Sequence, residues 1–292
     1  MNDNKTNINW YPGHMFKTKK QIISDLKLID VVVELLDARI PVSSRNPDIA
    51  EIIKGKKKII LLNKSDLADE ESNKKWVSYF SKEAPTICTD ASSGRGINAL
   101  TNAIDKIMQE EKEKQAARGR INKTTRVMIL GIPNVGKSSL INRLNKKVVA
   151  EVGNRPGVTK EKQWIRIGNN QELLDTPGVL WPKFESKEVA MNLAFTGTIK
   201  DDILEKVEVA YELVKVLYSD YLVNLRTRYK LTDEDIEYAK KSNNLAYTLM
   251  QIIVKRRGCS LSGGKVDDEK VASIILDDFR SGKLGRITLE KK

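Results

Sequence analysis

Eight consecutive residues near the middle of the chain have the types and spacing of a phosphate-binding loop. Residues 131–138 read GIPNVGKS and fit GxxxxGK(S/T), between an expected strand over 126–130 and an expected helix over 137–144. In such a loop the glycines let backbone N–H groups converge on phosphates, the lysine adds positive charge at the β and γ phosphates, and the hydroxyl can bind Mg²⁺. The residues expected to line this site are Asn134, Val135, Gly136, Lys137, Ser138 and Ser139.

Two further positions are candidates for the magnesium and γ-phosphate region. Residues 175–178 read DTPG and follow an expected strand, so that Asp175 can hold Mg²⁺ through water and the Gly178 amide can meet the γ phosphate. Thr159 lies between the two motifs and can close over Mg²⁺ and the γ phosphate when a triphosphate is bound. DxxG is a short pattern and a lone threonine is a weak signal, so both assignments depend on their position after the phosphate loop.

Residues 63–66, NKSD, decide which base is bound. The Asp66 carboxylate can accept hydrogen bonds from N1–H and the exocyclic amine of guanine, whereas adenine presents a lone pair and a C–H there. A buried carboxylate facing adenine would be left unpaired, which disfavours an ATPase or a kinase. Asn63, Lys64 and Ser65 complete the motif. After the next strand, Asp90 and Ala91 are expected in a loop whose backbone amide supports the guanine carbonyl.

The order of these motifs is unusual, because the guanine motif precedes the phosphate loop. A fold depends on spatial neighbours, so a chain whose original ends are joined and which is cut elsewhere can keep the same site. The cut falls just after DxxG, and the chain then enters the C-terminal third directly. We therefore expect a circularly permuted nucleotide-binding domain.

Apolar patterning supports this fold class. Strands and helices alternate up to residue 174, which predicts an α/β domain with a mostly parallel sheet and helices on both faces. Beyond residue 181 helical patterns dominate, and Thr232 followed by Asp235 is typical of a helix start. The predicted domains are residues 1–180, which bind nucleotide, and 181–292, a small all-α domain. Expected strands cover 29–36, 59–62, 86–89, 126–130, 164–167 and 172–174, and expected helices 15–28, 48–54, 70–80, 98–117, 137–144, 200–221, 245–256 and 267–279.

Composition favours a polyanionic partner. The 292 residues carry a net charge of +12, and residues 1–180 hold 31 Lys and Arg against 21 Asp and Glu, compared with 20 against 18 afterwards. Nucleic acid is the first candidate, although a solvated surface explains the same charge.

We expect a cytoplasmic protein because no apolar span or secretory signal is visible, and no lipidation signal supports a membrane-surface enzyme. Cys88 and Cys259 lack metal-ligand spacing.

Several segments together resemble a known family. NWYPGHM at 9–15, DARIPVSSRNP at 37–47, the phosphate loop, DTPGVLWPKF at 175–184, CSLSGGK at 259–265 and DFRSGKLGR at 278–286 are, in this permuted order, similar to bacterial ribosome biogenesis GTPase A. The similarity extends over essentially the whole chain. It implies a potassium-stimulated GTPase that acts late in assembly of the large (50S) ribosomal subunit and binds ribosomal RNA and protein.

Hydrolysis needs a group that orients the attacking water. The residue after DxxG is Val179, which cannot hydrogen-bond to water. The family resemblance suggests His14 as the catalytic residue, and a neutral imidazole can accept from water at cellular pH. A structural histidine or an RNA contact is the alternative. Asn134 resembles the potassium-coordinating asparagine of cation-dependent GTPases, and the alternative is that it only shapes the loop.

Two functions remain open from the sequence. One is an assembly GTPase, expected to be monomeric, whose hydrolysis on a large-subunit precursor triggers release; the other is a GTP-gated RNA or protein binding module in which hydrolysis is not essential. Candidate phosphate contacts in the C-terminal domain are Lys255, Arg256, Arg257, Lys283, Arg286, Lys291 and Lys292, although runs of charge usually form a solvated face.

Overall fold

The computed structural model describes residues 13–118, 124–145, 164–167, 170–174, 178, 180, 184, 186–199, 204–258 and 267–292, without the side chains of 13–16. The chain divides into two compact units. Unit 1 comprises residues 1–185 and 290–292, and unit 2 comprises residues 186–289. The assignment of unit 1 to nucleotide and of unit 2 to RNA remains a proposal.

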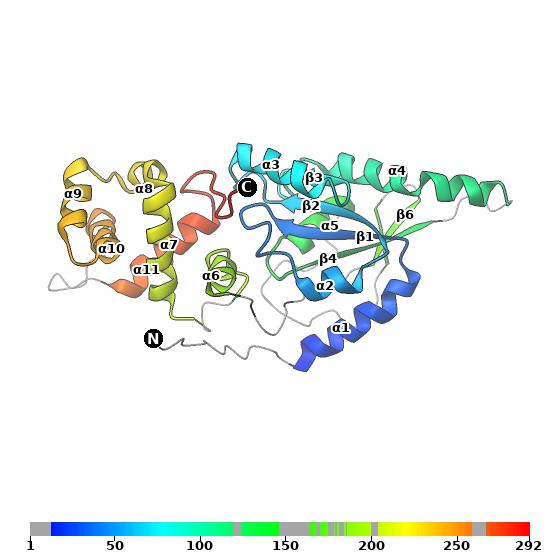
Figure 1. The fold of residues 1–292 in the computed structure, drawn as a ribbon, viewed down its shortest axis with the longest axis horizontal. Helices are drawn as coiled ribbons and strands as arrows, with labels where there is room; N and C mark the ends of the chain where they lie inside the picture. The colour runs from blue at the N-terminus through cyan, green and yellow to red at the C-terminus, as the bar shows by residue number, and fades with distance from the viewer. Residues whose placement is uncertain are drawn as a thin grey trace. The chain divides into compact units, whose positions relative to one another are not determined.

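Unit 1 contains a six-stranded sheet in the order β3-β2-β1-β4-β6-β5 (Figure 1). All neighbouring strands are parallel except β5, which runs antiparallel to β6. This confirms the predicted mostly parallel sheet. The strands are β1 (Val31–Asp37), β2 (Lys57–Asn63), β3 (Thr86–Cys88), β4 (Thr125–Gly131), β5 (Trp164–Arg166) and β6 (Gln171–Leu174).

Helices cover both faces of the sheet. Val32 of β1 packs with residues of α1 (Gly13–Asp25) and α2 (Pro47–Ile52), and Leu36 of the same face packs with α3 (Glu70–Phe80). The opposite face of β1 is equally buried, and α4 (Ile97–Ala116) contacts β2 while α5 (Lys137–Asn145) contacts β4. Parallel sheets need this double cover because both faces are apolar. As a result, the carboxyl ends of β1, β2 and β4 meet at one edge.

All regular secondary structure among the described residues of unit 2 is helical. It comprises α6 (Lys187–Phe195), α7 (Lys206–Asp220), α8 (Leu222–Tyr229), α9 (Asp233–Lys241), α10 (Leu245–Arg256) and α11 (Asp268–Arg280), which share one apolar core. The Thr232 and Asp235 side chains form a reciprocal cap at the start of α9, as predicted. Arg280 of α11 donates to the carbonyls of Ala194 and Phe195 at the end of α6, over 2.8 and 3.1 Å.

Candidate functional site

The phosphate loop connects β4 to α5 and is tightly constrained. Gly136 adopts φ +98° and Asn134 adopts φ +59°, and this left-handed region strongly favours glycine. A Cβ on Gly131 would lie 2.7 Å from the Leu35 carbonyl oxygen, so only glycine lets β4 end this close to β1. Lys137, Ser138 and Ser139 follow as the first residues of α5, and the backbone N–H groups in the first turn of a helix point toward its N-terminal end, where they can bind an anion.

The guanine motif contacts this loop directly. Asn63, at the end of β2, donates from Nδ2 to the Val135 carbonyl oxygen over 2.8 Å. Lys64 donates from Nζ to the Asn134 carbonyl oxygen over 2.6 Å. Two motifs separated by some 70 residues of sequence are therefore joined by hydrogen bonds. The expectation that the permuted order keeps them as spatial neighbours is confirmed.

The loop after β3 holds Asn63 from its other side. Asn63 Oδ1 accepts from the Ala91 backbone N–H over 3.1 Å and from Thr89 Oγ1 over 3.3 Å. The Asp90 carboxylate accepts from the backbone N–H and the hydroxyl of Ser92, over 2.8 and 2.5 Å. Burial raises the pKa of Asp90, but hydrogen bonds from Ser92 and Ser93 outweigh it and lower that pKa to about 2. Asp90 and Ala91 thus order the guanine motif, and their contact with a base stays a prediction.

Ser65 and Asp66 form the outer part of the guanine motif. Ser65 is buried and donates from both its backbone N–H and its hydroxyl to the Thr89 carbonyl oxygen, over 3.1 and 2.9 Å. Asn73 of α3 donates to the Ser65 carbonyl over 2.9 Å. These bonds fix the backbone that carries Asp66, which is half-buried. A rigid carboxylate at this position can discriminate between bases by hydrogen-bonding geometry.

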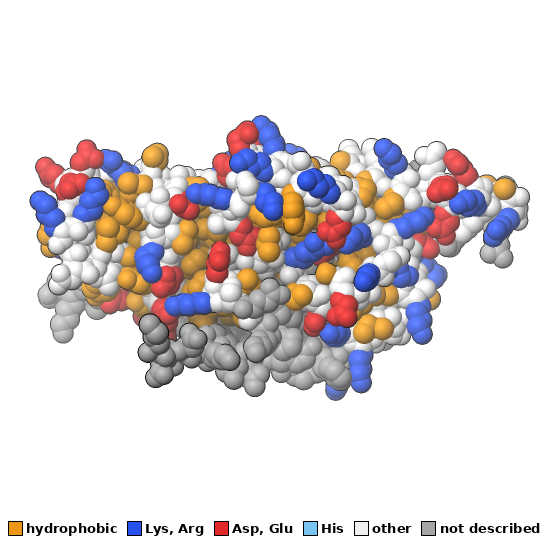
Figure 2. Space-filling model, viewed as in Figure 1, with side chains coloured by type: hydrophobic (Ala, Val, Ile, Leu, Met, Phe, Trp, Pro, Cys, Tyr) orange, Lys and Arg blue, Asp and Glu red, His pale blue; other side chains and the backbone are white. Residues whose placement is uncertain are grey.

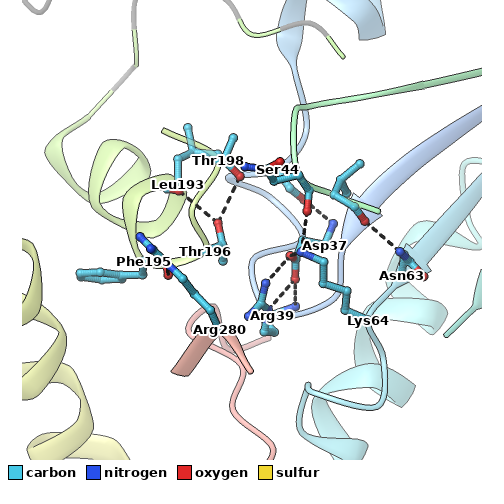
Figure 3. Close-up of polar contacts among 12 residues, drawn as sticks. Asp37, Arg39, Ser44, Asn63, Lys64, Leu193, Phe195, Thr196, Thr198 and Arg280 are labelled. Carbon is cyan, nitrogen blue, oxygen red and sulfur yellow. Dashed lines mark hydrogen bonds and ion pairs between the residues drawn. The ribbon is translucent and has the colours of Figure 1, made fainter. Parts of the chain in front are cut away.

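A buried ion cluster next to Lys64 had not been predicted. Asp37, the last residue of β1, lies 3.1 Å from Lys64 Nζ and forms a bidentate pair with Arg39, with N–O distances of 2.9 and 2.7 Å (Figure 3). Burial raises the pKa of Asp37, but the charges of Arg39 and Lys64 outweigh it and hold that pKa below its usual range. Burial lowers the pKa of Lys64 despite the opposing charge of Asp37. Asp37 therefore stays ionised and anchors the lysine that reaches the phosphate loop.

The remaining predicted site residues are only partly described. A Cβ on Gly178 would lie 3.0 Å from the Pro133 backbone nitrogen, so the DxxG glycine lies directly against the phosphate loop. Ser138 is the second residue of α5 and is half-buried. Thr159 and Asp175 lie outside the described residues, as does the side chain of His14, the second residue of α1. The described residues contain no group of three or more His, Cys, Asp or Glu that could hold a metal ion.

Comparison with known proteins identifies the family. A relative from Bacillus cereus named ribosome biogenesis GTPase A is 45% identical over 97% of this chain and 93% of its own length. The chain belongs to the ribosome biogenesis GTPase A family. It is therefore a GTPase with a role in ribosome biogenesis, and a GTPase of this kind binds guanine nucleotide, usually with Mg²⁺.

Other matches agree with this family. The profile described as "50S ribosome-binding GTPase" matches residues 126–254, a range that begins at the strand before the phosphate loop. Structures of YlqF from Thermotoga maritima, GNP-bound and GDP-bound, align with TM-scores of 0.62 and 0.63 at 27% identity, covering 94% and 93% of this chain and 98% of each structure. The predicted fold, a permuted GTPase domain followed by a helical domain, is confirmed.

The basic residues predicted to contact RNA lie in varied surroundings. Arg256 pairs with Asp235 over 2.6 Å, and Arg257 pairs with Asp278 over 3.2 Å. On the face shown in Figure 2, Lys and Arg side chains alternate with Asp and Glu instead of forming a single basic patch. Among the described helices, none is long and apolar enough to span a membrane.

Proposed function

We propose that this GTPase acts in late maturation of the large (50S) ribosomal subunit, binds ribosomal RNA and ribosomal protein of the precursor, and leaves it upon GTP hydrolysis. The supporting observation is the pair of hydrogen bonds from Asn63 and Lys64 to the phosphate loop, in a chain that belongs to an assembly GTPase family. We place this activity in the cytoplasm and in a monomer.

Each residue of the site has a proposed role toward the nucleotide. The α5 amides and Lys137 bind the phosphates, Asp66 pairs with guanine, and the Gly178 amide meets the γ phosphate. Ser138 supplies one oxygen ligand to Mg²⁺, Thr159 a second in the triphosphate state, and Asp175 binds it through water. Mg²⁺ suits this donor set because it prefers oxygen ligands and keeps several waters.

Hydrolysis is proposed to depend on two side chains supplied from outside DxxG. The imidazole of His14 accepts a hydrogen bond from the attacking water and orients it, since Val179 cannot hydrogen-bond to water. Asn134 holds K⁺ beside the phosphates, where a monovalent cation offsets charge that develops during the reaction. The left-handed backbone of Asn134 and its engaged carbonyl fix the position of this residue.

The proposal is tested by measuring GTP hydrolysis with and without large ribosomal subunits, in K⁺ and in Na⁺, with ATP as control. We expect strong stimulation by the subunit and by K⁺, with ATP inert. His14→Ala should lose the stimulated turnover while retaining GTP affinity. Equal turnover with and without subunits would contradict activation by the ribosomal subunit. Full stimulated turnover of His14→Ala would contradict the catalytic role of His14.

A GTP-gated binding module is the second candidate, and Val179 favours it because it leaves intrinsic hydrolysis slow. In this alternative GTP orders a surface for RNA or protein, and hydrolysis is dispensable. A hydrolysis-deficient His14→Ala protein that supports normal subunit assembly would favour the module. Accumulation of immature particles would favour the assembly GTPase.

A further inference from the structure

The loop between β1 and α2 binds a carboxylate through its backbone. The N–H groups of two successive residues, Val42 and Ser43, donate to the Glu290 carboxylate over 2.6 and 2.8 Å. The Ser43 hydroxyl donates to the same carboxylate. Two adjacent amides and a hydroxyl converging on one group make a small anion site, and bonds to a charged acceptor are stronger than neutral ones.

One face of α3 binds the rest of the same segment. Trp76 donates from Nε1 to the Glu290 carbonyl oxygen over 2.9 Å. The Lys292 ammonium lies 3.8 Å from the centre of the Tyr79 ring and 5.7 Å from that of Trp76, which is a cation–π arrangement. The segment is thus recognised through a carboxylate, a backbone carbonyl and an ammonium two residues later.

This segment comes from the far end of the chain. Residues 290–292 belong to unit 1, although residues 186–289 form unit 2, so unit 2 is joined to unit 1 at both of its chain ends. We propose that the loop after β1 and one face of α3 form a binding site for a Glu-X-Lys segment, that residues 290–292 occupy it in cis, and that its occupancy strengthens binding of guanine nucleotide.

The link to the nucleotide runs through the residue next to Ser43. The hydroxyl of Ser44 accepts the Asp37 backbone N–H over 3.0 Å. Asp37 in turn pairs with Lys64, and Lys64 donates to the Asn134 carbonyl of the phosphate loop. The Glu290 carboxylate therefore binds the tip of this loop, at Val42 and Ser43. The next residue, Ser44, hydrogen-bonds Asp37, which is the ion-pair partner of Lys64.

The other end of this loop is held independently. Arg45 pairs with Glu34 of β1 over 3.0 Å and with Glu83 over 2.5 Å. Loss of the Glu290 contact therefore affects the tip of the loop, at Val42 and Ser43, while Arg45 keeps the other end in place. If occupancy favours nucleotide binding, then nucleotide must favour occupancy by the same factor.

Glu290→Ala in the full-length protein tests the proposal with two readouts. Hydrogen exchange at the Val42 and Ser43 amides should accelerate at least about tenfold, because their charged acceptor is removed. GDP affinity, from titration with a fluorescent GDP analogue, should fall about fivefold or more. Glu290→Gln should lie between, since an amide oxygen still accepts. In the wild type, saturating GDP should slow exchange at both amides.

Glu234→Ala is the matched control, because Glu234 is an exposed glutamate of unit 2. It should change neither readout. Unchanged exchange in Glu290→Ala would show that the site is empty in solution and overturn the proposal. Faster exchange with GDP affinity within twofold of wild type would overturn the coupling to nucleotide. One result concerns occupancy of the loop and the other nucleotide affinity, so both are independent of the proposed action on the ribosomal subunit.

Discussion

Gly136 is the residue at which one added methyl group should separate the phosphate loop from the guanine motif. Its φ is +98°, and a Cβ would lie 2.3 Å from Nδ2 of Asn63. That same nitrogen donates to the Val135 carbonyl over 2.8 Å. In Gly136→Ala the backbone is strained and Asn63 must give up its bond to the loop.

The expected cost follows from these two effects. A left-handed backbone costs an alanine roughly 1–2 kcal/mol relative to glycine. Loss of a buried hydrogen bond that leaves a partner unsatisfied costs about 1–3 kcal/mol more. If these costs together destabilise the nucleotide-binding conformation by about 2–5 kcal/mol, GDP affinity decreases by at least about 30-fold.

Gly55→Ala separates the two effects. Gly55 has φ +82°, but a Cβ there meets no atom within 4 Å. Urea unfolding should show strain of roughly 1–2 kcal/mol for Gly55→Ala, with GDP affinity unchanged. Gly136→Ala should show a larger loss of stability and the loss of affinity. Equal unfolding free energies for both variants, with GDP affinity of Gly136→Ala within twofold of wild type, would refute the reasoning.

Three further substitutions probe other parts of the molecule. Asp66→Asn should lower GTP affinity at least about 100-fold and raise that for xanthosine triphosphate, whose C2 carbonyl can accept from an amide; competition titration measures both. Asp37→Asn should destabilise the protein at neutral pH. Because the folded-state pKa of Asp37 is depressed, its ionised carboxylate stabilises the folded protein above about pH 4, and this stabilisation is lost as the pH falls further. The difference in unfolding free energy between wild type and Asp37→Asn should therefore become smaller in acid. Asp278→Asn should destabilise unit 2 by about 1–3 kcal/mol, because the partly exposed Arg228 and Arg257 lose a charged acceptor, and GDP affinity should stay unchanged. The control in urea unfolding is Asp277→Asn, at an exposed position.

Local signals account for the elements that were predicted well. The structure gives α3 the predicted bounds, Glu70–Phe80, and the Asp69 side chain caps its start by accepting the Ser72 N–H. By contrast, α6 and α8 were not predicted. Only Tyr221 separates α8 from α7, and no side-chain cap marks its start, so periodicity alone does not reveal the break. The end of α8 depends on Lys230, which adopts φ +54° without being glycine or asparagine.

The candidate site likewise contains residues that local sequence signals predict and residues that only the tertiary structure brings together. Contiguous motifs predicted the residues for guanine and phosphate, because their spacing along the chain reflects the chemistry, and the structure brings these two motifs into contact. The ion cluster of Asp37, Arg39 and Lys64 was not predicted, since the pairing of Asp37 with Lys64 joins the ends of two neighbouring strands. The contact of Glu290 with Val42 joins residues 248 positions apart and has no periodic signal. Such contacts depend on tertiary packing, which local pattern does not encode.

Cosedimentation with large-subunit precursors tests the central claim most directly. The protein should pellet with the particles in the presence of Mg²⁺ and a non-hydrolysable GTP analogue, and should leave them with GDP or after GTP hydrolysis. Retention that is equal in GDP and in the analogue would contradict an assembly GTPase whose release depends on hydrolysis.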